Sequence, residues 1–380
     1  MLSTRNKDIL TRKIRVTFIL EMIKDDLPMN KKKIFQLIVI SAFCVMVITS
    51  LIFFISCIEY SSAPQYSMTI NESDHAVLTS TNGNGVKENF GVGLYNAPFH
   101  DAANSMHYSK YLEENESFTG YLYLSNQMSE ANDFLVFCLF DYTQVPFETE
   151  DGYIQVTRIL QLKPFEEVFF PFNLGTVSKG AHDFEIFVIM KPNEHSLNET
   201  FRRSTDISYL GSRRINVFVG NSTLVEPSYM HFDPEIYSSV CGSEYPVNNG
   251  ILITKQPCSR TLWFTENVKP GQILDYSINA AADNRYPVSF ALVALLDYIQ
   301  VPVQIVSKES TFFGRLEQGE KVSIPAQVQI PSLEGIHELM VVWMPAPYHK
   351  LEEKPGSPIH IPEGIWSTPS TRVGLNVTRF

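Results

Sequence analysis

The chain has 380 residues, of which 44% are hydrophobic, 12% aromatic and 19% charged, and its formal net charge is −11. This composition excludes a disordered or low-complexity protein. The acidic balance argues against nucleic acid as a partner, because phosphate binding needs clustered Lys and Arg. Five cysteines in a chain of this length exclude a small protein held together by disulfides. At about 100–200 residues per domain, the length favours two folded domains.

The charge is divided unevenly along the chain. Residues 1–33 contain nine Lys or Arg and four Asp or Glu, a balance of 9 − 4 = +5, whereas the remainder has 21 − 37 = −16. Between these parts, the 25 residues from Ile34 to Ile58 carry no charge. A helix of that length extends about 37 Å, enough to cross a bilayer core of about 30 Å. The sequence therefore predicts a single N-terminal transmembrane helix over 34–58.

The basic residues before this segment predict its orientation. Lys31, Lys32 and Lys33 stand directly before the apolar run, and Glu59 follows it. By the positive-inside rule, residues 1–33 form a basic cytoplasmic tail and the bulk of the chain is extracytoplasmic. We therefore expect a single-pass protein of the cell membrane, with its N-terminus in the cytoplasm.

Three interpretations of the segment 34–58 stay open. A run of 25 residues is long for a cleaved secretory signal, which favours an uncleaved signal anchor. The run ends in Phe54-Ile55-Ser56-Cys57, which resembles the lipobox of bacterial lipoproteins with Phe54 in place of the usual Leu. Cys57 is therefore a lipidation candidate, and a start at Met29 instead of Met1 gives an ordinary lipoprotein signal. Cleavage to a soluble product is the third interpretation.

The remaining chain contains an internal repeat. Three blocks recur in the same order at offsets of 154 to 156 residues, and a fourth, Arg214–Val217, has a fainter echo near Gly374–Val377. The three blocks are Phe134–Pro146 with Phe290–Pro302, Leu162–Val168 with Leu316–Val322, and Gly180–Asp183 with Gly335–Glu338. Internal repetition at a fixed period indicates copies of one structural unit. The sequence predicts two copies, over 62–220 and 221–380.

The repeated blocks have the length of strands. Phe134–Phe140 and Ala291–Leu296 are short apolar runs closed by Asp-Tyr and then Pro. Runs of about seven residues favour buried strands over helices, and the frequent prolines leave no room for long helices. Many short strands with regular turn signals are typical of a β-sandwich. The predicted fold class is all-β, with two tandem β-sandwich units after the transmembrane helix.

The order of turns and strands resembles bacterial immunoglobulin-like and fibronectin-III-like surface domains. In those families a Pro-Gly-Glu type of turn precedes one strand and a Gly-x-Tyr corner opens the next. Glu317–Glu320 matches this turn, whereas Lys163–Glu166 has Phe165 where the family has Gly. His182 and His337 stand where the corner Tyr is expected. The resemblance implies an immunoglobulin-like sandwich and implies no activity, because such folds host many functions.

The recurring polar residues are expected to have structural roles. His182 and His337 each follow a Gly-x pair and precede an acid, and each belongs to a different copy. We expect a corner histidine that is hydrogen-bonded to a nearby carbonyl. Asp141 and Asp297 close equivalent strands, and we expect them to accept backbone N–H bonds in the next turn.

The divergent N-terminal parts of the two copies contain the weak binding candidates His100, Asp101, His107 and His231. Two histidines seven residues apart fit no standard zinc spacing, and the chain lacks His-Glu-x-x-His, Cys-x-x-Cys and Gly-x-Ser-x-Gly. We therefore predict no catalytic residue, no metal site and no cofactor.

Covalent modification has several candidate sites. Cys241 and Cys258 are 17 residues apart, and a disulfide is permitted in an extracytoplasmic segment. Cys138 lies in an apolar strand and is expected to be a buried thiol. The Asn-x-Ser/Thr pattern of N-glycosylation occurs at Asn71, Asn115, Asn198, Asn221 and Asn376.

Two classes of function remain open. The repeat, the anchor and the missing catalytic motifs favour a membrane-tethered, non-catalytic module for interaction, adhesion or structure, with an extracytoplasmic protein or glycan as partner. The alternative is a ligand-binding receptor or a hydrolytic enzyme whose site lies in the divergent N-terminal parts of the copies, around His100, Asp101, His107 and His231.

Overall fold

The computed structural model describes parts of the chain after residue 89. The described residues are 90–99, 105–203, 210–231, 241–242, 247, 249–304, 309–354, 357–362 and 364–379. They lie in a unit that extends from Ile70 to Phe380. The predicted tail 1–33, the predicted membrane segment 34–58 and Cys57 lie outside the described residues. No helix within the described ranges is long and apolar enough to cross a membrane.

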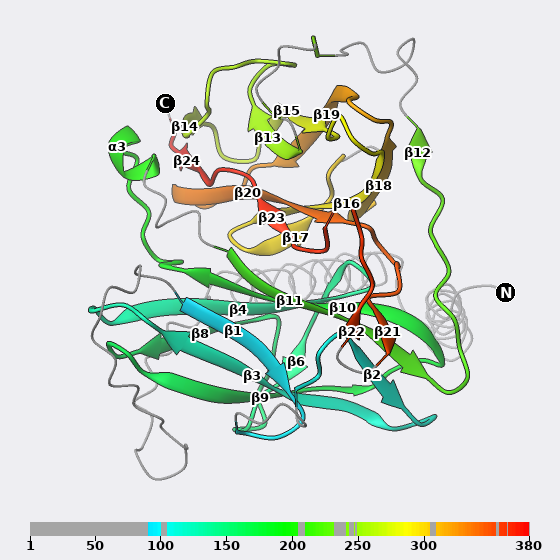
Figure 1. Cartoon of the computed structure of the whole chain (residues 1–380). Coiled ribbons are helices and arrows are strands. Elements are labelled where there is room, and N and C mark those ends of the chain that lie inside the picture. The colour runs from blue at the N-terminus through cyan, green and yellow to red at the C-terminus, as the bar shows by residue number, and fades with distance from the viewer. Residues whose placement is uncertain are drawn as a thin grey trace, which may run out of the picture. The chain divides into compact units, whose positions relative to one another are not determined.

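The strands before residue 220 form two sheets, which we call the N-terminal sheet pair (Figure 1). Its outer sheet has the order β1-β3-β9-β6-β7, and its second sheet has the order β2-β11-β10-β4-β5 with β8 paired to β4. The bounds are β1 Phe90–Tyr95, β2 Ser109–Leu112, β3 Ser117–Asn126, β4 Asn132–Phe140, β5 Thr143–Val145, β6 Phe147–Glu148, β7 Ile154–Gln155, β8 Thr157–Leu162, β9 Glu167–Thr176, β10 Gly180–Met190 and β11 Leu210–Val219. A short helix, α3 (Glu199–Arg202), lies between β10 and β11.

The later strands form the C-terminal sheet pair and one small hairpin. The outer sheet is β13-β15-β19, and the second sheet is β12-β18-β16-β20-β24-β14 with β17 on β16 and β23 on β20. The bounds are β12 Met230–His231, β13 Gly250–Thr254, β14 Thr265–Val268, β15 Ile273–Ala281, β16 Val288–Leu296, β17 Ile299–Val301, β18 Thr311–Leu316, β19 Lys321–Gln329, β20 Gly335–Pro345, β23 Thr368–Pro369 and β24 Val373–Val377. The hairpin consists of β21 (Glu352–Lys354) and β22 (Ser357–Pro358). The described part is thus all-β apart from α3, as the sequence predicts.

Each sheet pair encloses its own hydrophobic core. In β3, Phe118, Leu122 and Leu124 are buried in the N-terminal core and alternate with more exposed residues. In β15, the buried Tyr276 and Ile278 belong to the C-terminal core. Because successive side chains of a strand point to opposite faces, this alternation places one face of each outer sheet inward.

A third apolar cluster joins the second sheets of the two pairs, and we call this contact the joint. Its N-terminal members are Leu135, Phe137, Leu139, Tyr142, Phe187 and Ile189, and its C-terminal members are Ala291, Val293, Leu295, Tyr298, Met340, Val342 and Met344. Every residue of β16 is buried, and β4 has a run of six buried residues. These strands are covered on both faces, which explains why their sequences are continuous apolar runs instead of alternating ones.

The strand registers show which residues correspond in the two pairs. Asp183 of β10 is opposite Asn216 of β11, and Glu338 of β20 is opposite Gly374 of β24. Asn216 therefore corresponds to Gly374. The faint sequence echo instead aligns Asn216 with Asn376, so its register is wrong by two residues. Gly374 does not resemble asparagine in sequence, so an alignment by residue type matches Asn216 to Asn376 instead.

The Leu-x-x-x-Glu turns of the repeat have the same geometry in both copies. The Glu166 carboxylate accepts from the backbone N–H of Lys163 at 2.6 Å, and the Glu320 carboxylate accepts from Glu317 at 2.8 Å. Phe165 has a φ of 58° where Gly319 has a φ of 71°. The phenylalanine thus occupies a left-handed position that favours glycine, so the turn persists despite the departure from the family pattern.

Candidate functional site at the joint

The weak binding candidates do not form a described site. His100 and Asp101 lie outside the described residues. His107 is exposed in the turn before β2, at a φ of 37°, and its backbone N–H donates to Ser105 at 3.2 Å. His231 lies in β12 of the C-terminal sheet pair, opposite Arg315. The two described histidines therefore belong to different sheet pairs.

The glycosylation candidates differ in their surroundings. Asn71 lies outside the described residues, and Asn115 and Asn221 are exposed. Asn198 is the N-cap of α3, where its side-chain oxygen accepts from the backbone N–H groups of Thr200 and Phe201. The Asn376 amide donates to Asn267 at 2.8 Å.

The cysteines have distinct environments. Cys241 and Cys258 are joined by a disulfide, with their Cα atoms 5.3 Å apart. Cys138 is a free, buried thiol in β4, and burial raises its pKa above the usual range. The disulfide therefore links the segment before β13 to the segment after it, and Cys138 packs as an apolar side chain in the N-terminal core.

The two recurring histidines make the same pair of hydrogen bonds. Nδ1 of His182 lies 2.7 Å from the Asp141 carboxylate, and Nε2 lies 3.0 Å from the Ser178 carbonyl oxygen. For His337 the corresponding distances, to Asp297 and Leu333, are 2.6 and 3.0 Å. The carbonyl contact confirms the predicted corner role. Hydrogen bonding to the neighbouring aspartate raises the pKa of each histidine, although burial acts in the opposite direction.

The recurring aspartates also accept a backbone bond, but not where the sequence predicts it. Asp141 accepts from the N–H of Asp183 at 3.1 Å, and Asp297 accepts from the N–H of Glu338 at 2.9 Å. Both donors lie in the neighbouring strand rather than in the next turn. Asp141 and Tyr142 both have positive φ and form a two-residue hairpin between β4 and β5. Such a hairpin matches the twist of the strands and turns the aspartate back towards β10.

Two glutamines join the sheet pairs reciprocally. The Gln144 side-chain oxygen accepts from the backbone N–H of Gln300 at 2.7 Å, and the Gln300 oxygen accepts from Gln144 at 2.6 Å. Their amide groups donate to the carbonyl oxygens of Tyr298 and Tyr142 at 2.9 and 3.0 Å. The two glutamines are 156 residues apart, which is the offset of the first repeated block. Two glutamines at corresponding positions of the sequence repeat thus contact one another.

Asp183 is the centre of a buried polar cluster at the joint. Arg214 donates to it at 2.6 Å, Asn216 donates at 2.7 Å, and the Tyr142 hydroxyl is also bonded to it. The C-terminal sheet pair contributes the backbone N–H of Tyr348, at 2.6 Å. Arg214 in turn donates to the carbonyl oxygens of residues 345 and 346, each at 2.6 Å. The charge of Asp183 is therefore compensated by groups from both sheet pairs.

Glu338, which corresponds to Asp183, is the centre of a second cluster. Arg202 of α3 donates to it through both Nη atoms, at 2.6 and 2.8 Å, and His195 lies 3.1 Å away. Nε of Arg372 is 3.6 Å from the carboxylate. Burial raises the pKa of Glu338, but these three neighbours outweigh it and hold the pKa below its usual value. Of the two arginines, Arg202 comes from the N-terminal half of the chain and Arg372 from the C-terminal half.

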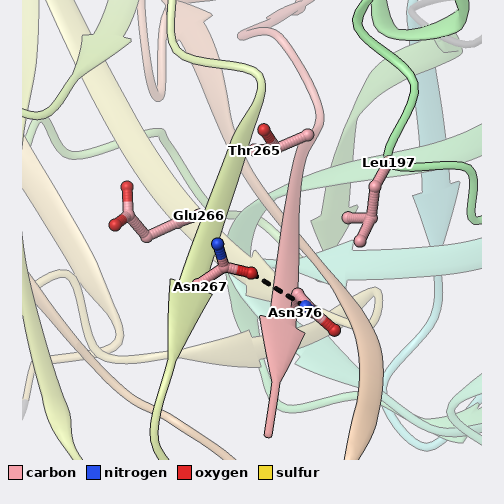
Figure 2. Close-up of a pocket in the computed structure, with 5 residues that line it drawn as sticks. All are labelled: Leu197, Thr265, Glu266, Asn267 and Asn376. Carbon is pink, nitrogen blue, oxygen red and sulfur yellow. Dashed lines mark hydrogen bonds between the residues drawn. The ribbon is translucent and has the colours of Figure 1, made fainter.

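A pocket of about 240 Å³ lies beside β14 and β24, at one edge of the second sheet of the C-terminal sheet pair, and Figure 2 shows its lining. Thr265, Glu266 and Asn267 come from β14, Asn376 comes from β24, and Leu197 comes from the segment before α3. The Asn267 and Asn376 amides are hydrogen-bonded to one another (Figure 2). The lining contains no residue of the predicted binding set.

The polar groups at the joint are bound to one another by hydrogen bonds and ion pairs. In the described ranges no cluster of three His, Cys, Asp or Glu side chains could hold a metal ion. Sequence reasoning missed the roles of Arg202, Arg214, Gln144 and Gln300. The repeated Gln in the first block was a usable signal for two of them, whereas Arg202 has no counterpart in the repeat.

Comparisons with known proteins add weak structural neighbours. No protein-family model matches the chain, and no curated protein matches it in sequence. The chain is similar to the CARDB domain of the PF1109 protein of Pyrococcus furiosus, solved with di-metal ions, at 12% identity and a TM-score of 0.23. That match covers 37% of this chain and 100% of the other.

Two further neighbours have similarly low identity. The fibronectin(III)-like modules of Clostridium thermocellum CbhA match at 9% identity over 71% of this chain and 90% of theirs, with a TM-score of 0.16. An ASH/PapD-like domain of human CEP192 matches at 12% identity over 34% of this chain and 84% of its own, with a TM-score of 0.20. Likeness at this level transfers no activity, ligand or partner to this chain.

Proposed function

We propose that the chain is a membrane-tethered, non-catalytic ectodomain in which two copies of one β-sandwich unit act as a single rigid interaction module. The observation that carries this proposal is the use of the repeated polar residues. Asp141, His182 and Gln144, with their counterparts in the second copy, all make structural contacts within or between the sheet pairs. The polar residues that recur in both copies therefore make structural hydrogen bonds, and these bonds use the groups that a binding or catalytic site would need.

The joint supports the rigidity that the proposal needs. Apolar side chains from both second sheets pack in one cluster, and a buried ion pair between Arg202 and Glu338 connects the two halves of the chain. A flexible linker between sandwiches leaves their relative orientation free, whereas a large apolar contact restricts it. A module of this kind presents its outer surfaces to an extracytoplasmic protein or glycan in a defined geometry.

The tether is proposed from the uncharged segment 34–58 and the basic residues before it. We expect the intact mass of the mature protein to include this segment. A mature species that begins at Cys57 and carries the mass of acyl chains would contradict the uncleaved anchor and establish the lipoprotein form. External protease added to intact cells should digest the residues after 58 and spare the tail 1–33.

The non-catalytic function is tested with the full-length protein in membranes. We expect no turnover of a panel of glycosides, esters and peptides, and saturable binding to a surface glycan or protein in a binding array. Variants with Ala at His107 or His231 should bind as the unmodified protein does. Turnover that is lost in either variant would overturn the proposal in favour of a hydrolytic enzyme with its site in the divergent parts.

A further inference from the structure

Glu185 is a buried carboxyl group that lacks the compensation given to its neighbours. It lies in β10, on the face that points to the joint, and is 3% exposed. Neither of its oxygens makes a hydrogen bond of normal geometry with a described residue. Asp183, two residues earlier on the same face, accepts bonds from Arg214, Asn216 and Tyr348. A buried carboxylate without such partners is costly when ionised.

The position that corresponds to Glu185 in the C-terminal sheet pair holds an apolar side chain. Glu185 is opposite Leu139 in β4, and Met340 is opposite Leu295 in β16, so Glu185 corresponds to Met340. Met340 belongs to the apolar cluster of the joint. One of two corresponding positions therefore holds an apolar side chain, and the other holds an acid in the same setting.

The groups that face Glu185 come from several elements. Arg214 of β11 is the nearby cation, and Asp183 of β10 is the nearby anion. Ser212 of β11 and Ser367, just before β23, bring hydroxyl groups near it, and the register partner from β4 is the apolar Leu139. The phenols of Tyr142 and Tyr348 lie around Asp183 and are held neutral, because burial raises their pKa values.

The two Nη atoms of Arg214 are committed to other acceptors, whereas its Nε makes no hydrogen bond with a described residue. Its two Nη atoms donate to Asp183 and to the carbonyl oxygens of residues 345 and 346. Because Asp183 already balances the positive charge of Arg214, this arginine compensates an ionised Glu185 only weakly. Burial raises the pKa of Glu185 to about 7, against the lowering influence of Arg214, Ser367 and Ser212. An ordinary glutamate titrates near 4.5.

We propose that Glu185 makes the joint sensitive to protons: the two sheet pairs pack tightly while this carboxyl group is protonated, and the joint loosens when the group is ionised. This inference goes beyond the proposed function, because it concerns a switch within the module and not its partner. A mildly acidic medium therefore favours the closed joint, and a mildly alkaline medium favours its opening.

The direction follows from proton linkage. When the joint opens, Glu185 becomes solvated and its pKa returns towards 4.5. Between that value and about 7, the closed form binds more protons than the open form, so closure weakens as the pH rises. From pH 6 to pH 8 the opening equilibrium constant should increase about tenfold for one such group.

Hydrogen exchange of the full-length protein in detergent tests the proposal. Protection is measured at pH 6 and pH 8, corrected for the intrinsic exchange rate. The reporters are peptides containing Gln144, Gln300 and Tyr348, whose backbone N–H groups donate across the joint, and peptides from the outer strands β3 and β15 serve as the reference. In the unmodified protein, protection of these three amides should fall about tenfold more than that of β3 and β15. In Glu185→Gln, which keeps the shape but cannot ionise, this excess should disappear.

Two further variants keep the test decisive. Glu185→Met reproduces the side chain at Met340 and should also abolish the excess loss of protection, even if Glu185→Gln folds poorly. The exposed Glu150→Gln serves as the matched control and should behave as the unmodified protein does. An unmodified joint with equal protection at both pH values overturns the proposal. So does a loss of protection that both position-185 variants retain.

Discussion

At the scale of single residues, the most informative side chain is Arg202. It comes from α3, in the N-terminal half, yet its guanidinium group binds Glu338 of β20 through two hydrogen bonds. Gly374 makes room for it, since a Cβ at that position would lie 2.5 Å from Nη2 of Arg202. Asn216, the residue that corresponds to Gly374, binds the acid itself in the other cluster. The two acids thus share a corresponding arginine, Arg214 near Asp183 and Arg372 near Glu338, and differ in their other donors.

Removal of Arg202 is therefore expected to be costly. Arg202→Ala leaves Glu338 buried with weaker compensation from Arg372 and His195, and should lower the free energy of unfolding by about 3–5 kcal/mol. Its neighbour Arg203 is a matched control, because its ion pair with Glu199 is exposed. Arg203→Ala should cost less than about 1 kcal/mol. Chemical denaturation measures both values, and similar costs for the two variants would contradict the assigned role.

The corner histidines predict a pH dependence of stability. Hydrogen bonds to Asp141 and Asp297 raise the pKa values of His182 and His337, so the folded state binds more protons than the unfolded state in the window above pH 6.5. Their stabilisation is complete below pH 6.5 and is lost as the pH rises through the raised values.

The measurement is the free energy of unfolding against pH, from about pH 6 to pH 9. Each histidine contributes a slope of at most about −1.4 kcal/mol per pH unit. The double variant His182→Asn with His337→Asn should show a shallower decline than the unmodified protein. Parallel curves would show that the raised pKa values do not contribute to stability.

Among the structural elements, the repeated turn keeps its geometry although its sequence differs between the two copies. The turn at Phe165 and the turn at Gly319 have the same Glu-to-backbone hydrogen bond and the same left-handed residue. Phe165 is 50% exposed, so little packing compensates its conformation. A non-glycine residue in the left-handed region costs about 1–2 kcal/mol, which the first copy tolerates.

Phe165→Gly is therefore expected to stabilise the protein. The variant removes the steric cost of the left-handed position and should raise the free energy of unfolding by about 1 kcal/mol. The reverse change, Gly319→Ala, should destabilise the protein, since its φ is 71° and a Cβ would lie 2.7 Å from the Asn284 side-chain oxygen. Thermal unfolding measures both shifts, and a lower melting temperature for Phe165→Gly would refute the prediction.

The strands were more predictable than their environment. The length and β-rich composition of Phe134–Phe140 predict a strand, and the repeat predicts its partner in the second copy. The sequence does not reveal that the second face of β4 is covered by the other sheet pair, because that burial depends on long-range packing. For the same reason the contact between Arg202 and Glu338, 136 residues apart, leaves no local pattern.

Across the described part of the molecule, the joint connects the two separate hydrophobic cores. Its apolar cluster, the reciprocal Gln144 and Gln300 bonds and the two acid clusters all connect the sheet pairs. Opening the joint would expose one apolar face of β4 and one of β16 to water, because the other face of each strand packs in the core of its own sheet pair. We therefore expect the two sheet pairs to unfold together.

The chain offers a separate probe for each half. All three tryptophans, Trp263, Trp343 and Trp366, belong to the C-terminal half. Cys138 is a buried free thiol in the N-terminal core, and its accessibility to a thiol reagent reports the unfolding of that core. Peptide-resolved mass spectrometry distinguishes labelling of Cys138 from labelling of the other cysteines.

The most direct test is one denaturant titration of the full-length protein, followed by tryptophan fluorescence and by pulsed labelling of Cys138. Coupling through the joint predicts that both probes report the same midpoint and the same steepness. A fluorescence transition and a Cys138 transition at clearly different denaturant concentrations would contradict this coupling, because the two sheet pairs would then be independent domains.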